Sequence, residues 1–136
     1  MACRKKTYSF FVILMLMFCS FSLFADGDPE HVDFKKKNFP GRKKEFRLAV
    51  SAFEKGNFLY ERGKFREALD LFQTACDFNP DHTDLNFKLG ICLLNTRNQE
   101  KAIEHFLKAE QLNASVSQNY PKFNYGLGLA YQYDYQ

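Results

Sequence analysis

The sequence repeats itself with a period of 34 residues, and this repeat constrains the fold more than any other feature. Four residues of the first unit return at the same offset in the second: Gly56, Ala68, Phe72 and Ala75 return as Gly90, Ala102, Phe106 and Ala109. The Ala–Phe–Ala set is spaced by four and three residues, which places it on one face of a helix. A unit of this size cannot bury such a face alone, so neighbouring units must stack on one another.

These residues resemble the tetratricopeptide repeat, a helix–turn–helix unit of 34 residues. In that family a small residue in the first helix lets the second helix approach closely, and a small–aromatic–small set packs against it. The resemblance implies an all-α helical solenoid, with Gly63 in the first turn between helices. It also implies which residues have a structural role in the repeats: Gly56, Ala68, Phe72, Ala75, Pro80, Gly90, Ala102, Phe106, Ala109 and Gly128.

A third unit begins near the end of the sequence. Residues 127–131 restate the Leu-Gly-x-x-Tyr core of a first helix, and their Gly128 follows Gly90 by 38 residues. The turn to a second helix would begin at Gln136, the last residue of the sequence. We therefore expect two full repeats and the first helix of a third, and we expect the chain to be the N-terminal piece of a longer protein.

The third unit also allows a different interpretation. From Tyr125 to Tyr135 every second residue is Tyr or Leu, an alternation typical of a strand in an outer-membrane barrel. The helical interpretation is favoured because the repeat register independently predicts Leu127, Gly128 and Tyr131.

The first 25 residues have the pattern of a secretory leader. The basic Arg4-Lys5-Lys6 precedes an apolar run from Tyr8 to Phe24, and the small Ala25 stands before a polar stretch. A cleaved signal peptide is the favoured interpretation, with an uncleaved membrane anchor as the alternative. The leader carries the whole net charge of +3, because the rest of the chain holds 16 basic and 16 acidic residues. This balance removes the argument for nucleic acid as a partner.

A charged segment connects the leader to the repeats. It has basic runs at 35–37 and 42–44, and the Phe-Pro-Gly that ends at Gly41 predicts a long helix starting just after it. We interpret the basic runs as a solvated linker offset by the acids beside them, with binding to anionic lipid or nucleic acid as the alternative. The predicted division is 1–25 signal peptide, 26–46 charged linker and start of the first helix, 47–82 first repeat, 83–116 second repeat and 117–136 partial third repeat.

The sequence has no catalytic or metal-binding constellation. His31, His82 and His105 are scattered, and none has a second ligand at metal spacing. Phosphate-binding loops and nucleophile motifs are also missing, so we expect no enzyme activity, cofactor or metal. His105 is expected on an exposed helix face. Cys76 and Cys92 are expected to be small core residues, although an oxidising compartment would permit a disulfide.

The resemblance also implies a groove, lined by the first helices of successive repeats, that holds a peptide or a helix of a protein partner. The groove residues that the register implies are Phe53, Asn57, Tyr60, Phe87, Lys88, Ile91, Leu94, Tyr125 and Leu129. Asn57 fits one position of the carboxylate clamp of some family members, but Phe53 and Gly126 occupy others that should be polar. The apolar set suits either a peptide groove or an interface with another domain, and both interpretations stay open.

A narrower resemblance concerns the order of leader, Lys-rich stretch and repeats. It is similar to the N-terminus of Bacteroidetes-type cell-envelope proteins, in which the repeats precede a WD-repeat-like β-propeller and an outer-membrane protein A-like peptidoglycan-binding domain. This resemblance implies an exported protein-binding scaffold in the periplasm or at the outer membrane, in a secretion or motility complex. The alternatives are an accessory module that recruits a downstream catalytic domain, or a piece anchored by its leader and ending in a barrel strand.

Overall fold

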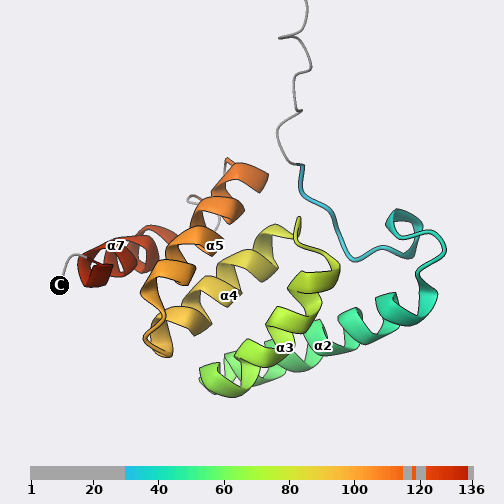
Figure 1. Ribbon diagram of the computed structural model, residues 1–136, viewed down its shortest axis with the longest axis horizontal. Coiled ribbons are helices and arrows are strands. Elements are labelled where there is room, and N and C mark those ends of the chain that lie inside the picture. The colour runs from blue at the N-terminus through green and yellow to red at the C-terminus, as the bar shows by residue number, and fades with distance from the viewer. Residues whose placement is uncertain (1–29, 115–117, 119–121, 135–136) are drawn as a thin grey trace, which may run out of the picture.

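The computed structural model describes residues 30–114, 118 and 122–134, and every regular element in these ranges is helical (Figure 1). The all-α prediction is therefore confirmed, whereas the predicted leader lies outside the described residues. The elements are the 3-10 turn η1 (Lys36–Asn38) and the helices α2 (Lys43–Glu61), α3 (Phe65–Phe78), α4 (Thr83–Asn95), α5 (Gln99–Leu112) and α7 (Phe123–Asp134).

The helices are stacked in the order of a solenoid. Within the repeats, α2 packs against α3 and α4 packs against α5 (Figure 1). Between repeats, α4 packs against α3 and α7 packs against α5. The helices α3, α4 and α5 thus bury their apolar stripes against neighbours on both sides, as a stack of repeats requires.

Two glycines set the distance between the paired helices. A Cβ atom built on Gly56 of α2 would lie 2.7 Å from the ring of Phe72 on α3, and one built on Gly90 of α4 would lie 2.7 Å from the ring of Phe106 on α5. Both rings are fully buried. The helices can approach this closely only because neither glycine has a side chain.

The described part of the third unit is a helix. Phe123 and Ala130, seven residues apart and therefore on one face of α7, are both fully buried, and α7 packs against α5. The strand interpretation of the Tyr and Leu alternation is therefore wrong for residues 123–134. The helical register prevails because it offers a face of small and apolar residues to α5.

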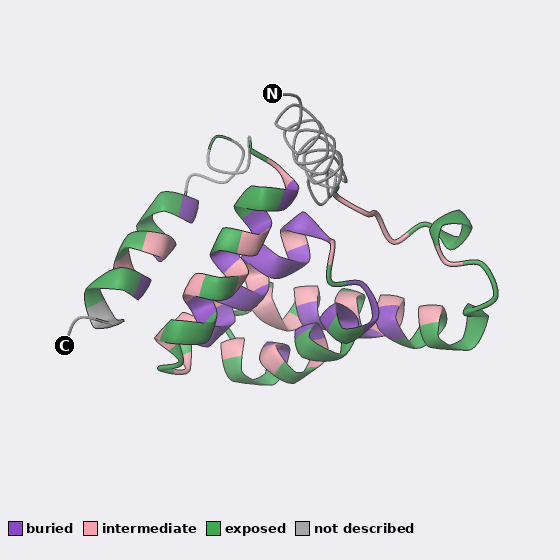
Figure 2. Cartoon of the chain, turned by 45° about the horizontal axis from the view of Figure 1, so that its top comes forward, coloured by how far each residue is buried: buried purple, intermediate pink, exposed green. Residues whose placement is uncertain are grey.

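The core is continuous through the repeats and is rich in aromatic side chains. Figure 2 shows buried residues gathered where α3, α4 and α5 meet. Cys76 and Cys92 belong to this core as free thiols, and burial raises their pKa values to about 11 and about 12. They act as small apolar side chains there. Within the described part of the chain, no helix combines the length and apolarity needed to cross a bilayer.

Candidate partner-binding face

The predicted groove residues lie on the first helices of the three units, and the structure gives them different environments. We call the surface that α2, α4 and α7 share the first-helix face. Tyr125 on α7 is 69% exposed, whereas Phe87 on α4 is only 5% exposed. The remaining members are half-buried: Phe53, Asn57, Tyr60, Lys88, Ile91, Leu94 and Leu129.

Phe87 is a core residue, so its predicted role in the groove is wrong. Its ring lies 6.1 Å from that of Phe106 and 6.0 Å from that of Phe123, measured between centroids. Phe123 belongs to α7, which covers this part of α4. The register alone placed Phe87 on the groove side, but the docking of α7 buries it.

A polar network occupies the centre of the first-helix face. The Lys88 Nζ donates a hydrogen bond of 2.8 Å to Asn57 Oδ1 and forms a 2.8 Å ion pair with Asp84 Oδ2. The same nitrogen lies 5.8 Å from the ring centroids of Phe53 and Tyr60. Lys88 therefore connects α4 to α2 between two aromatic rings. Burial, with Cys92 and Asp84 as smaller causes, raises the pKa of Tyr60 to about 12, so its hydroxyl stays neutral.

The segment that leads into and includes η1 is docked on the repeats, so it is not a free linker, although its basic run 35–37 is exposed as expected. We call residues 31–39 the strap. Phe34 stacks on Phe53 with 5.2 Å between ring centroids, and its ring lies 5.1 Å from that of His82. Further along, the Phe39 ring lies 4.7 Å from that of Phe78. These two aromatic residues in a charged stretch are the sequence signal that could have revealed the docking.

Backbone hydrogen bonds hold the strap to the loop between α3 and α4. The Val32 N–H donates to the Asp81 carbonyl at 2.7 Å, and Asn79 Nδ2 donates to the Val32 carbonyl at 2.8 Å. Asn79 is itself buried, so its amide needs this partner. The strap thus covers the part of the first-helix face around Phe53, while the part formed by α4 and α7 stays uncovered by it.

Three side chains next to the strap have the composition of a metal site. Ligand atoms of His31, Asp33 and His82 lie within 4.8 Å of one another. However, the Nδ1 atoms of His31 and His82 accept backbone N–H groups from Thr83 (3.1 Å) and Leu85 (3.2 Å). In a neutral imidazole whose Nδ1 accepts a hydrogen bond, the proton is on Nε2. The Nε2 atom of His31 then donates to Asp33 Oδ1, 2.9 Å away. The cluster therefore serves as a hydrogen-bonded cap on α4, and these tautomers leave neither Nε2 free to bind a cation.

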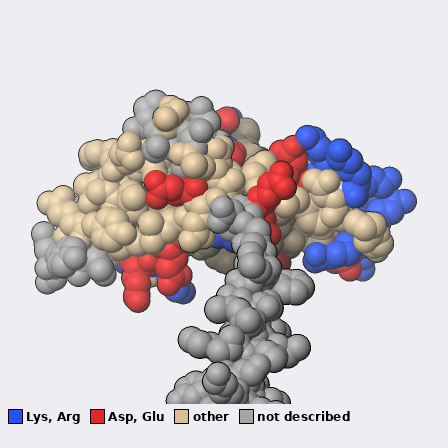
Figure 3. Space-filling model, turned by 90° about the horizontal axis from the view of Figure 1, so that it is seen from above, with Lys and Arg blue, Asp and Glu red and all other residues tan. Residues whose placement is uncertain are grey.

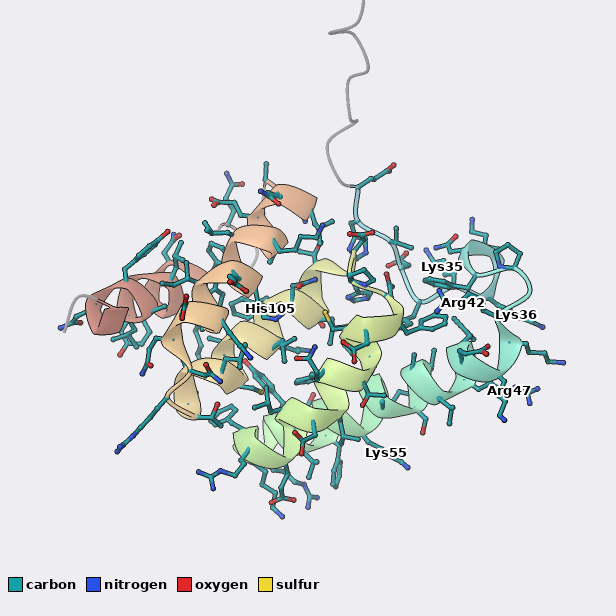
Figure 4. All side chains as sticks on the ribbon, in the orientation of Figure 1. Lys35, Lys36, Arg42, Arg47, Lys55 and His105 are labelled. Carbon is teal, nitrogen blue, oxygen red and sulfur yellow. The ribbon has the colours of Figure 1, made fainter. Side chains whose placement is uncertain are left out.

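His105 lies between α5 and α4, not on an exposed face (Figure 4). Its Nδ1 is 3.0 Å from Asn86 Oδ1, and the Asn86 amide group donates to the carbonyls of Pro80 (2.7 Å) and His82 (3.0 Å). Burial lowers the pKa of His105. Asn86 is fully buried and needs polar partners, so it holds the imidazole inside. Sequence reasoning missed this network because only the second repeat has it.

The comparisons with known proteins agree with this architecture. Residues 53–117 match the family model described as tetratricopeptide repeat, a range that spans the helices from the middle of α2 to the end of α5. A comparison with curated proteins finds no match. The helical solenoid seen in the structure is thus the fold expected of the family that the sequence matches.

Proposed function

Because residues 53–117 consist of tetratricopeptide repeats, which bind protein partners in general, we propose that this chain is a scaffold that binds a segment of another protein on the first-helix face. The repeats themselves are a non-catalytic class of protein-interaction unit.

The observation that carries the proposal is the apolar surface of α4 and α7 beside the strap. Tyr125 is largely exposed, and Ile91, Leu94 and Leu129 are half-buried on the same pair of helices. An exposed aromatic ring among partly exposed aliphatic side chains is the composition of interface hot spots. The cation of Lys88 is already paired with Asp84, so the face favours apolar side chains over a terminal carboxylate. We propose an amphipathic helix or an extended peptide as the occupant.

Peptide selection from a random library would test this face. Selected peptides should be apolar or aromatic at two or more positions, and Tyr125→Ala should weaken their binding on the order of 10-fold or more. Leu107→Ala is the matched control, because Leu107 is also exposed but lies on the second helix α5. An equal loss in both variants, or no loss in Tyr125→Ala, would place the binding surface elsewhere.

We also propose that the protein is exported and acts in the cell envelope, as part of a larger outer-membrane or peptidoglycan-associated protein. The support is the basic and apolar pattern of residues 1–25 and the narrower resemblance of the N-terminal region. Sequencing the N-terminus of the mature protein tests this proposal. A start at Asp26 supports export with cleavage, whereas a start at Met1 supports an uncleaved anchor.

A further inference from the structure

Positive charge is concentrated at one end of the molecule. Residues 35–47 contain seven Lys or Arg and one Glu, and they form η1, the turn after it and the first turns of α2. Figure 3 shows these cations gathered at the end of the molecule where α2 begins. In Figure 4, Lys35, Lys36, Arg42 and Arg47 lie together there, and Lys55 lies further along α2. We call residues 35–48 the basic end.

Most of these cations form no ion pair with an acid in the part of the chain that the structure describes. Lys35 is paired with Asp33, and the Arg42 guanidinium lies 4.2 Å from the centre of the Phe78 ring. The other five cations of the basic end are exposed and form no ion pair within the described residues: Lys36, Lys37, Lys43, Lys44 and Arg47. Asp33 faces His31 and Lys35, so the strap does not bring this acid to the start of α2. Glu45 is the one acid within the basic end itself.

The cations also surround an uncapped helix N-terminus. Arg42 is the N-cap of α2 and makes no side-chain capping hydrogen bond, and Lys43 and Lys44 follow in the first turn. The N-terminus of a helix carries partial positive charge and free N–H groups, so Lys and Arg are unfavourable there. An anion such as a phosphate group would be stabilised by the same N–H groups and by the side-chain cations. The arrangement therefore suits an anionic surface in contact with the molecule.

An exposed apolar side chain stands among these cations. Leu48 is 61% exposed and lines a shallow hollow together with Lys43, Lys44 and Arg47. Basic residues around an exposed Leu suit a lipid interface, where the cations meet headgroup phosphates and the apolar group enters the acyl boundary. The aromatic rings needed to stack on nucleic acid bases are engaged here, since Phe39 and Phe46 pack against Phe78. A lipid surface is thus favoured over nucleic acid.

We propose that the basic end docks this molecule on an anionic lipid surface, with headgroup phosphates over the N-terminus of α2 and Leu48 at the acyl boundary. This contact lies away from the first-helix face of α4 and α7, so the molecule can bind lipid and a protein partner together. In the sequence the basic end follows the apolar run 8–24, but the proposed contact uses only residues that the structure describes.

Vesicle flotation with the full chain tests the proposal. Binding to vesicles of phosphatidylglycerol mixed with phosphatidylcholine is compared with binding to vesicles of phosphatidylcholine alone. The neutral vesicles report insertion of the apolar run 8–24, and the difference between the two reports the contribution of charge. Lys43→Gln/Lys44→Gln/Arg47→Gln should weaken binding to the anionic vesicles on the order of 100-fold, because each cation contributes roughly 5-fold. Binding should also fall as salt is added.

A second triple variant is the matched control. Lys55→Gln/Arg66→Gln/Lys101→Gln removes three exposed cations outside the basic end and should leave most of the binding intact. Leu48→Ser should lower binding on the order of 10-fold at every salt concentration, since its contribution is apolar. Circular dichroism establishes that each variant is folded.

Three results would overturn the proposal. The first is unchanged vesicle binding when the cations of the basic end are removed. The second is an equal loss of binding in both triple variants, which would show that vesicle binding depends on the net charge of the molecule and not on the basic end. The third is tighter binding to a duplex oligonucleotide than to anionic vesicles at the same phosphate concentration, which would assign the basic end to nucleic acid.

Discussion

The first and second repeats share the contact between a glycine and a phenylalanine, but they differ in the turn between the helices and in the polarity of the core around it. In both, a glycine of the first helix lies under a buried Phe of the second. The turn between the helices has positive φ in each, with Gly63 at 73° and Arg97 at 61°. The position that holds the buried Ala52 in the first repeat holds Asn86 in the second.

This comparison teaches that the helix–helix contact defines the repeat, while turn and core polarity vary around it. The second repeat accepts a non-glycine residue in a left-handed conformation. It also accepts a buried amide, because Asn86 has hydrogen-bond partners in Pro80, His82 and His105. The predictions below test how far the two repeats are equivalent.

The largest effect is expected where the two repeats are most alike. Ala68 and Ala102 are fully buried at equivalent positions, so Ala68→Glu or Ala102→Glu forces a carboxylate into a contact sized for a methyl group. Each should cost more than about 4 kcal/mol and leave the module unfolded. Thermal denaturation followed by circular dichroism measures this, with Gln111→Glu on the exposed face of α5 as control. A melting temperature equal to that of the parent would show that the register is wrong.

The next largest effect is the loss of stability on replacing Phe87 by Ala, which should exceed the loss at its equivalent in the first repeat, Phe53. Phe87→Ala should destabilise the protein by about 3–5 kcal/mol, because its ring is buried between α5 and α7. Phe53→Ala should cost about 2 kcal/mol, since this ring is half-buried under the strap. Urea denaturation gives both values. If Phe87→Ala kept its stability and lost partner binding, the groove role of Phe87 would be restored.

The start of α4 should respond to pH, whereas α2 has no titratable cap. Burial, with the neighbouring His31 as a smaller cause, lowers the pKa of His82 from 6.5 to about 4. As pH falls through this window, the unfolded chain takes up a proton that the folded chain resists. Stability should therefore be complete above pH ~6.5 and fall by up to about 3 kcal/mol as pH approaches ~4. The half-buried His105 adds a loss in the same direction, because burial also lowers its pKa.

Urea midpoints measured across this pH range test the assignment. His82→Asn keeps an acceptor at the N-cap of α4 but removes the titration, so its stability should depend less steeply on pH. An identical pH dependence in the variant and the parent would assign the effect to other groups.

Glycines in the second and third units should respond with opposite signs. Gly90→Ala places a Cβ against the ring of Phe106, which is fully buried and has no space to move, and should cost about 1–3 kcal/mol. A Cβ on Gly128 meets nothing within 4 Å, so Gly128→Ala should stabilise α7 by about 0.5–1 kcal/mol. Melting temperatures of the two variants decide this, and destabilisation of both would contradict the open environment of Gly128.

The smallest expected effect comes from exchanging the turn residues. Arg97→Gly should stabilise the protein by about 0.5 kcal/mol, because relief of the left-handed strain outweighs the greater freedom of glycine in the unfolded chain. Gly63→Arg should destabilise by about 1 kcal/mol for the converse reason. Urea denaturation of the exchanged pair measures both changes, and a loss of stability in Arg97→Gly would mean that the Arg97 side chain contributes contacts of its own.

Sequence by itself determined the helical hairpins and the faces they bury. The 34-residue period and the Ala–Phe–Ala spacing are local patterns, and helical geometry converts such a pattern into one face of one helix. The break at Gly41 similarly predicted the start of α2, which begins at Lys43. The stack of helical hairpins follows from these signals because each unit contacts only its neighbours.

Only the tertiary structure decided which surfaces stay open. The docking of Phe34 on Phe53, the burial of Phe87 under α7 and the pairing of His105 with Asn86 each join residues from different elements. A periodic pattern along one chain carries no information on such contacts, because they depend on the shape that several packed helices form together. The exposed cations at the start of α2 show the same division. Their charge was visible in the sequence, but that they form no ion pair within the described residues was not.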